Sequence, residues 1–221
     1  MRIRARLCWE VVSTGFVVAA VAIMLGLFLR DRMHPTDRPG PAAVAYFDNW
    51  REWREAGVWM GPSDASVVVA VFMDFGCPYC KDLVPVLDSL AAAFPAEVAV
   101  EFHYLPWVGE RFAERAAVAA ECSRRQGRFR EMYRALFLDL GSSGPEDWEG
   151  VAVKAGIPDL DFFLGCLDLP LESFDRINRI VALSREIGVR GTPKVWLNGR
   201  LFHGRTFGAF RKEIEGFLRL K

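Results

Sequence analysis

The sequence predicts an α/β protein with one mixed sheet, helices on both faces and a helical insertion. Three observations predict it. A strand, a helix and a second strand follow one another between residues 66 and 105, as in the β–α–β unit of a parallel sheet. Helical patterns then fill residues 107–170. A further helix, a hairpin and a closing helix complete the chain.

An apolar segment precedes this body. Val11–Leu29 contains no charged residue, and as a helix it would span roughly 28 Å, close to the hydrocarbon thickness of a bilayer. Arg2, Arg4 and Arg6 stand before it. The positive-inside rule therefore predicts cytoplasmic residues 1–10, a single transmembrane helix over 11–29 and an extracytoplasmic or periplasmic body.

The rival interpretation of this segment is a cleaved signal peptide. Signal peptides usually have apolar regions of about 7–15 residues with a small-x-small site close behind. The nearest such site, Ala43-Val44-Ala45, lies well past the apolar segment. Its length favours a retained anchor in the cell membrane, and either interpretation places the body where disulfides form.

A proline-rich stretch, His34–Pro41, marks residues 30–43 as a linker, so that the globular domain is expected over 44–221. Val44–Ala56 has the pattern of a short amphipathic helix that ends at Gly57. The chain has 28 basic and 28 acidic residues, and without a basic field no nucleic-acid partner is expected.

The first strand is predicted at Ser66–Phe75, a continuous apolar run typical of a strand buried on both faces. Lys81–Phe94 has helical spacing with Pro85 as a kink, and Val98–Leu105 is the second strand. The remaining predicted elements are helices at Arg111–Arg125, Arg128–Leu138, Pro145–Ala155, Asp159–Leu167 and Ser173–Ile187, strands at Lys194–Leu197 and Arg200–His203 around the Asn198-Gly199 turn, and a helix at Phe207–Leu220.

Cys77-Pro78-Tyr79-Cys80 follows the first strand directly and begins the helix. At that place free backbone N–H groups and the helix dipole stabilise a thiolate. Pro78 suits the first helical turn because no hydrogen bond needs its missing N–H. We therefore predict that Cys77 is the exposed nucleophile and Cys80 the buried resolving thiol, with Tyr79 completing the active-site dipeptide.

Two cysteines at this spacing also suit a metal. A closed zinc site needs two more ligands, and His103 and His203 are each single histidines on predicted strands. A Cu(I)-handling protein with Cys77, Cys80 and a histidine stays open as an alternative. The favoured interpretation has no metal and no cofactor.

Gly191-Thr192-Pro193 stands just before a short strand, a place where proline is normally found only at an edge or bend. A cis Thr192–Pro193 bond would expose the backbone of Thr192 for pairing with an extended peptide. An ordinary trans proline that opens the strand is the alternative.

These motifs together resemble the DsbA-like branch of the thioredoxin superfamily. The matching stretches are VVVAVFMDFGCPYC (Val67–Cys80), ECSRRQGRF (Glu121–Phe129), FLGCL (Phe163–Leu167) and GVRGTPKVWLNGR (Gly188–Arg200). The resemblance implies a thioredoxin fold with an inserted helical domain, a catalytic Cys77/Cys80 pair and a facing cis-Pro193 that binds substrate with Thr192. It also implies exported proteins with thiols or disulfides as substrates and a redox partner in the membrane.

Cys122 and Cys166 fall in the first and last predicted helices of the insertion. The related motifs often carry cysteines at these places, and exported domains seldom leave thiols free, so a structural disulfide is favoured. Two unpaired buried thiols or a second redox pair are the alternatives.

Asp74 and Glu101 stand on or beside the buried strands, where a carboxylate near the resolving cysteine can accept its proton. For Asp74 the alternative is a cap of the loop. The sequence thus predicts a membrane-anchored protein thiol–disulfide oxidoreductase of undetermined direction; a copper-handling protein or a non-catalytic tethered chaperone are the alternatives.

Overall fold

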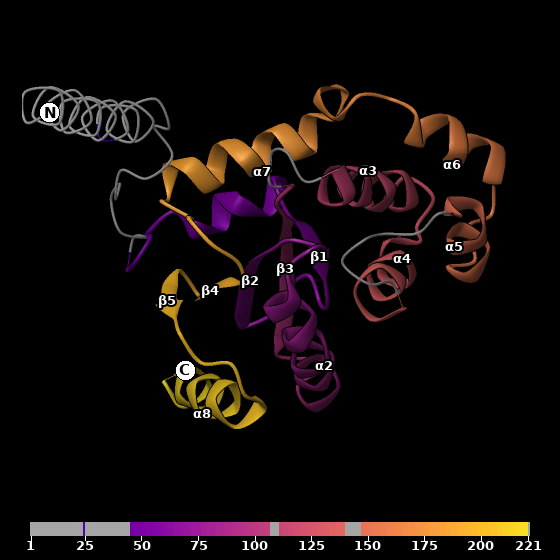
Figure 1. The fold of residues 1–221 in the computed structure, drawn as a ribbon. Helices are drawn as coiled ribbons and strands as arrows, with labels where there is room; N and C mark the ends of the chain where they lie inside the picture. The colour runs from indigo at the N-terminus through magenta and orange to yellow at the C-terminus, as the bar shows by residue number, and fades with distance from the viewer. Residues whose placement is uncertain (1–23, 25–44, 107–110, 140–146, 221) are drawn as a thin grey trace, which may run out of the picture. The chain divides into compact units, whose positions relative to one another are not determined.

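A five-stranded sheet of order β1–β3–β2–β4–β5 forms the centre of the unit Ala42–Lys221 (Figure 1). Strands β2 and β3 are parallel, and the other neighbours are antiparallel. The bounds are β1 Val58–Met60, β2 Val67–Met73, β3 Val98–Tyr104, β4 Lys194–Leu197 and β5 Arg200–Phe202. Every residue of β2 and β3 is buried, which explains their continuous apolar runs. The predicted mixed sheet is confirmed.

This computed structural model describes residues 24, 45–106, 111–139 and 147–220. The predicted membrane segment, residues 11–29, lies outside that part of the chain except for Met24. Among the described residues, no helix is both long enough and apolar enough to cross a bilayer. Residues Ala42–Lys221 form a compact unit.

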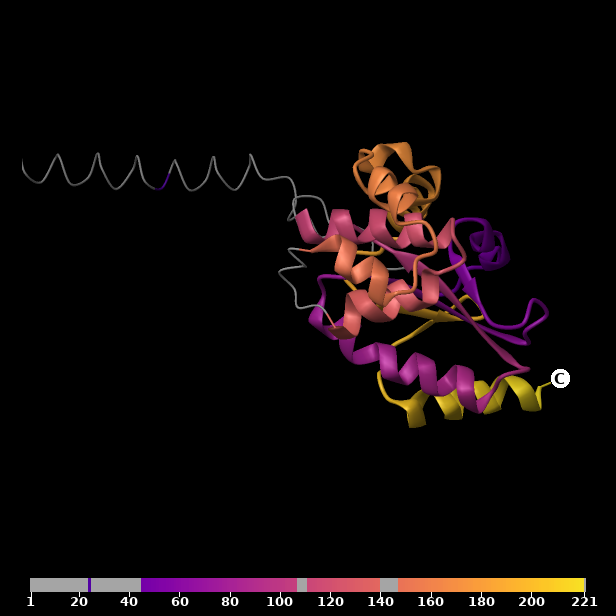
Figure 2. The same ribbon diagram turned by 90° about the vertical axis from the view of Figure 1, so that its right-hand side faces the viewer.

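Helices cover both faces of the sheet. Helices α2 and α8 contact each other on one face, and α7 lies on the other, as Figure 2 shows with α2 and α8 below the strands and α7 above them. The bounds are α2 Pro78–Ala93, α3 Arg111–Arg124, α4 Phe129–Arg134, α5 Trp148–Lys154, α6 Leu160–Leu167, α7 Asp175–Glu186 and α8 Phe207–Arg219, with shorter turns at η2 Trp50–Glu55, η3 Ala135–Asp139 and η4 Leu171–Ser173.

The helical insertion, α3 to α6, packs on the sheet through aromatic side chains. Phe102 of β3 makes edge contacts with Tyr133 of α4 and Phe137 of η3, with ring centroids 4.8 and 6.2 Å apart. Phe137 also packs on Phe75, just after β2, at 4.8 Å. The predicted insertion is confirmed, and these contacts fix it beside the strand that leads to the cysteines.

The segment before β1 differs from the prediction. Instead of an amphipathic helix over 44–56, Tyr46 forms a bridge with Arg200, and only Trp50–Glu55 is helical, as a 3-10 turn. The backbone at Ala45 and Phe47 hydrogen-bonds to Leu201 and Gly199, which gives the edge strand β5 an extended partner. The short edge strand β1 was not predicted.

Candidate active site

Cys77 stands at the junction of a sharp turn and helix α2. It is the N-cap, with extended backbone, and Pro78 is the first helical residue. Asp74 shapes the turn: its carboxylate oxygen accepts from the Gly76 N–H at 2.6 Å, and its carbonyl accepts from the Cys77 N–H at 3.1 Å. This is the loop-capping role that the sequence left open for Asp74.

The two thiols have different environments. Cys77 is partly exposed, whereas the Cys80 side chain is fully buried. Burial raises the pKa of the Cys80 thiol, although hydrogen bonds from the Asp74 backbone and the Thr192 side chain oppose the shift. The Asp74 N–H lies 3.5 Å from Cys80 Sγ. Cys80 is therefore held as a neutral thiol behind an accessible Cys77.

The Thr192–Pro193 segment faces Cys77. The peptide bond between the two residues is cis, and Pro193 is buried. Cys77 Sγ lies 3.4 Å from the carbonyl oxygen of Thr192, a distance within hydrogen-bond range for a thiol donor. The structure thus brings together the two motifs that the sequence singled out separately.

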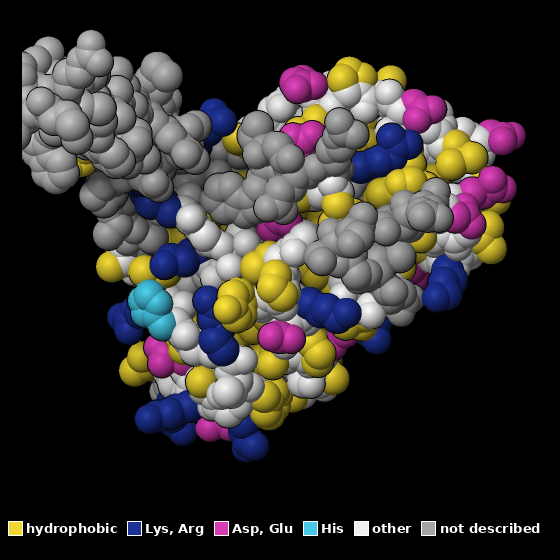
Figure 3. Space-filling view, in the orientation of Figure 1, with side chains coloured by type: hydrophobic (Ala, Val, Ile, Leu, Met, Phe, Trp, Pro, Cys, Tyr) yellow, Lys and Arg dark blue, Asp and Glu magenta, His cyan; other side chains and the backbone are white. Residues whose placement is uncertain are grey.

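A cavity of about 370 Å³ opens beside this segment. Tyr79, Asp82, Leu83, Thr192 and Arg205 line it. Tyr79 is 71% exposed, so its ring offers apolar surface at the cavity mouth. Arg205 Nη2 donates to the Pro193 carbonyl at 3.0 Å. On the face shown in Figure 3, basic and acidic side chains lie close to hydrophobic ones over the start of α2.

Sequence reasoning missed Asp82 and Arg205. Asp82 reads as one more polar position of an amphipathic helix, and Arg205 stands in the turn between β5 and α8 without a motif. Only the packing of α8 beside α2 brings the two residues to one cavity.

Glu101 does not join the cysteines. Side chains alternate along a strand, and Val98 and Val100 line a cavity with Leu87 of α2, so Glu101 points to the opposite face. There its carboxylate lies 3.3 Å from His103 Nε2, and both side chains are fully buried. The predicted direct proton relay through Glu101 is wrong for this reason.

The histidines do not complete a metal site with the cysteines. The His103 ring stacks on Phe72 at 4.3 Å, on the sheet face away from α2, and His203 is exposed in the turn after β5. Among the described residues, no group of three or more His, Cys, Asp or Glu side chains is placed to hold a metal ion. The arrangement therefore favours thiol chemistry over zinc or copper binding.

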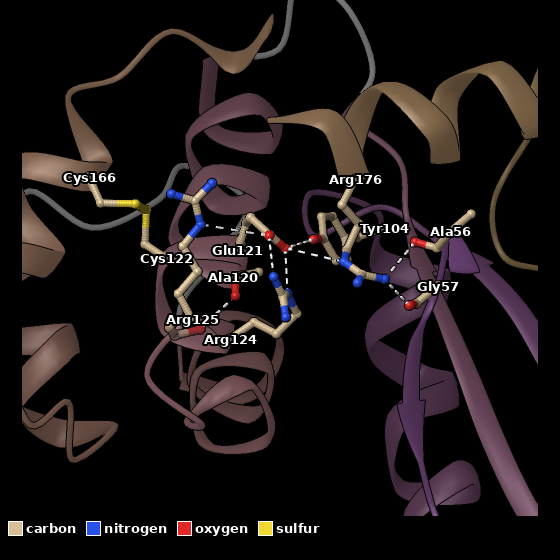
Figure 4. Close-up of polar contacts among 11 residues, drawn as sticks. Ala56, Gly57, Tyr104, Ala120, Glu121, Cys122, Arg124, Arg125, Cys166 and Arg176 are labelled. Atoms are coloured by element: carbon tan, nitrogen blue, oxygen red, sulfur yellow. Dashed lines mark hydrogen bonds and ion pairs between the residues drawn. A yellow bond between two sulfur atoms is a disulfide. The ribbon is translucent and has the colours of Figure 1, made fainter. Parts of the chain in front are cut away.

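Cys122 and Cys166 are joined by a disulfide that links α3 to α6 (Figure 4). Both residues are buried. The bond closes the insertion on itself. Its role as a structural crosslink stays a prediction.

Next to this disulfide, Glu121 forms a buried polar hub (Figure 4). Its carboxylate accepts hydrogen bonds from the Tyr104 hydroxyl at 2.7 Å and from Arg124 at 2.7 and 2.9 Å. Arg176 of α7 lies 3.8 Å away and donates to the carbonyls of Ala56 and Gly57. The hub connects α3, β3, α7 and the residues before β1.

Burial alone would raise the pKa of the Glu121 carboxyl, but the hydrogen bonds from Arg124 and Tyr104, with the nearby arginine charges, lower it overall. Burial and the neighbouring carboxylate raise the pKa of the Tyr104 hydroxyl. Glu121 is therefore a carboxylate and Tyr104 a neutral donor at neutral pH.

Comparison with known proteins supports this geometry. A family model described as "Thioredoxin" matches residues 54–216. Among solved structures, BdbD from Bacillus subtilis superposes with a TM-score of 0.67 at 19% identity, covering 81% of this chain and 100% of that one. A periplasmic thioredoxin-like protein from Salmonella enterica serovar Typhimurium gives 0.65 at 24% identity, covering 78% and 98%. At these identities the superpositions show the fold.

Two kinds of relative match in sequence. The "Na(+)/H(+) antiporter NhaA 1" of Salinispora arenicola is 34% identical over 145 residues, which are 65% of this chain and 22% of the relative. The chain thus spans about a fifth of the length of such relatives. The "Probable disulfide bond formation protein D" of Bacillus anthracis is 25% identical over 217 residues, covering 93% and 95%. The family model and the match to the disulfide bond formation protein confirm the resemblance inferred from the motifs.

Proposed function

The chain belongs to the thioredoxin family, and on that premise we propose that it is a protein thiol–disulfide oxidoreductase whose reacting atoms are the sulfurs of Cys77 and Cys80. One observation carries the proposal. A partly exposed thiol at the start of α2 faces the Thr192 carbonyl, and a second thiol, Cys80, is buried one helical turn behind it.

The reaction proceeds in two exchanges. The Cys77 thiolate attacks one sulfur of a substrate disulfide, a Cys77–substrate bond forms, and the first substrate thiolate leaves. Cys80 then gives up its proton and attacks Cys77 Sγ, the Cys77–Cys80 bond forms, and the second substrate thiolate leaves. Two electrons pass from the protein dithiol to the substrate, and the reverse sequence introduces a disulfide into a substrate dithiol.

The surroundings suit a peptide substrate. Thr192 and Pro193 lie beside the attacking sulfur, and an extended peptide could pair with the backbone of Thr192, which precedes β4 and lies beyond its pairing with β2. Pro78 and Tyr79 are exposed next to Cys77, where they contact the bound chain. The high pKa that burial gives Cys80 keeps it protonated until the mixed disulfide has formed.

We also propose that the protein acts on exported proteins from the outer face of the cell membrane, with residues 11–29 as its anchor and a membrane protein as its redox partner. The apolar length of that segment and the arginines before it support this placement. "Probable disulfide bond formation protein D", the name of a relative that covers most of the chain, fits a role in disulfide formation.

The test uses the full chain in a Cys8→Ala background, so that Cys77 and Cys80 are the only thiols outside the Cys122–Cys166 bond. Equilibration with glutathione at set ratios of its two forms should interconvert the Cys77–Cys80 dithiol and disulfide. The reduction potential obtained decides whether the protein donates disulfides to its substrates or reduces substrate disulfides. Cys77→Ser should abolish reduction of insulin disulfides, and full activity of this variant would overturn the proposal.

A further inference from the structure

Arg205 projects from a turn that its two neighbours constrain. It lies between β5 and α8, directly before Thr206, whose side chain caps α8 by accepting from the Ala209 N–H at 3.3 Å. Gly204, on its other side, packs against the Phe202 ring so closely that a Cβ would not fit. From this turn the guanidinium reaches the carbonyl of Pro193 at 3.0 Å.

Arg205 also lines the cavity beside Thr192. A guanidinium has five N–H donors in a planar fork, and the Pro193 carbonyl needs only one or two of them. Asp82 of α2 lines the same cavity, and Leu83 and Tyr79 supply apolar surface. The cavity therefore has a positive side at the Pro193 segment and a negative side at α2.

We infer that Arg205 is a specificity residue that binds the carboxylate of an acidic side chain next to the reactive cysteine of the substrate. This inference rests on the proposed function. A peptide that runs along Thr192 passes the Arg205 side of the cavity, and the guanidinium fork matches a carboxylate in geometry and charge. Asp82 repels an acidic side chain from the α2 side, so the two charges also orient the peptide.

The experiment uses three peptide disulfides that differ only in the residue after the reactive cysteine: Glu, Gln or Lys. Each rate of exchange with the reduced full chain is divided by the rate of the same peptide disulfide with 2-mercaptoethanol, a neutral thiol, which corrects for the pKa of the peptide's leaving thiol. We expect the Glu peptide to react roughly three- to tenfold faster than the Lys peptide. The ratio should fall at high salt.

Variants assign the preference to its residue. Arg205→Gln should bring the Glu-to-Lys ratio close to unity, and Asp82→Asn should raise it. Arg211→Gln is the matched control, because Arg211 pairs with Glu215 on α8 and should leave the ratio unchanged. Arg205→Lys keeps the positive charge and should therefore retain part of the preference for the Glu peptide. It separates the loss of charge in Arg205→Gln from any disturbance caused by loss of the contact with Pro193.

The outcomes separate two claims. Exchange that is equally fast with all three peptides, or a ratio that persists in Arg205→Gln, overturns the inference about Arg205 and leaves the oxidoreductase proposal intact. No exchange with any peptide overturns the oxidoreductase proposal itself.

Discussion

Cys77 Sγ lies 3.4 Å from the carbonyl oxygen of Thr192, although 115 residues separate them in sequence. Sheet pairing explains the approach. Strands β2 and β4 are antiparallel with Phe72 opposite Lys194. The turn after β2 and the segment before β4 therefore meet at the same end of these two strands. The attacking sulfur thus stands where an added peptide strand would lie.

Burial of Cys80 makes the stability of the reduced protein sensitive to alkaline pH. Its pKa is raised from 9.0, so the folded state keeps a proton that the unfolded state loses above that pH. The stabilisation is complete below about pH 9 and declines as pH rises. The free energy of unfolding measured in urea should fall between about pH 8 and about pH 10 more steeply for reduced wild type than for Cys80→Ala. Parallel curves for the two proteins would contradict this expectation.

The Glu121 hub should matter most at neutral pH. Glu121→Gln is expected to lower the free energy of unfolding by about 2–3 kcal/mol, because charge-assisted hydrogen bonds to Arg124 are lost. The folded-state pKa lies below 4.5, so the carboxylate stabilises above about pH 4.5 and this contribution disappears as pH falls through the folded value. Denaturant unfolding of wild type and Glu121→Gln at neutral and acidic pH measures both the loss of unfolding free energy and its dependence on pH. A difference between the two proteins that is the same at both pH values would count against the hub.

The disulfide in the insertion is expected to stabilise without taking part in exchange. Replacing both Cys122 and Cys166 with alanine removes a crosslink across 44 residues, worth about 4 kcal/mol in the chain-entropy model. The melting temperature should fall. The rate of insulin reduction, measured well below that temperature, should stay within about twofold of the wild-type rate, a difference of less than about 1 kcal/mol, because about 1 kcal/mol corresponds to a fivefold change. Loss of activity in a folded double variant would instead indicate a second redox pair.

Gly57 tests the packing around the buried Glu101–His103 pair. A Cβ at Gly57 would lie 2.7 Å from Glu101 Cγ and 2.9 Å from His103 Cε1. Gly57→Ala should therefore destabilise by about 1–3 kcal/mol. Gly216→Ala is the control, because a Cβ there meets nothing within 4 Å and alanine favours the helix interior by about 0.5–1 kcal/mol. Thermal unfolding of both variants gives the comparison, and equal effects would contradict the packing argument.

Much of the fold follows from local patterns. The buried runs of β2 and β3, and the Asn198-Gly199 turn with positive φ at both residues, were predicted because their signals are local. The helix expected over 44–56 failed because pairing with β5 determines that backbone. Helical periodicity in a short segment cannot reveal an edge strand elsewhere.

The site divides in the same way. The motif at Cys77 and Cys80 carries its own chemistry, so its residues are readable from sequence. Glu101 was misassigned because one residue of register decides which face of a strand an acid occupies. The roles of Arg205 and Glu121 depend on contacts between elements that are distant in sequence, so no local pattern predicts those roles.

The most direct test of the central claim is to trap the intermediate. Cys80→Ser, reduced and in the Cys8→Ala background, should accumulate a stable mixed disulfide with a substrate protein or peptide, and mass spectrometry should locate the bond at Cys77. Wild type should resolve the same adduct rapidly with formation of the Cys77–Cys80 bond. Failure to form an adduct at Cys77, or an adduct that resolves equally fast without Cys80, would contradict the account.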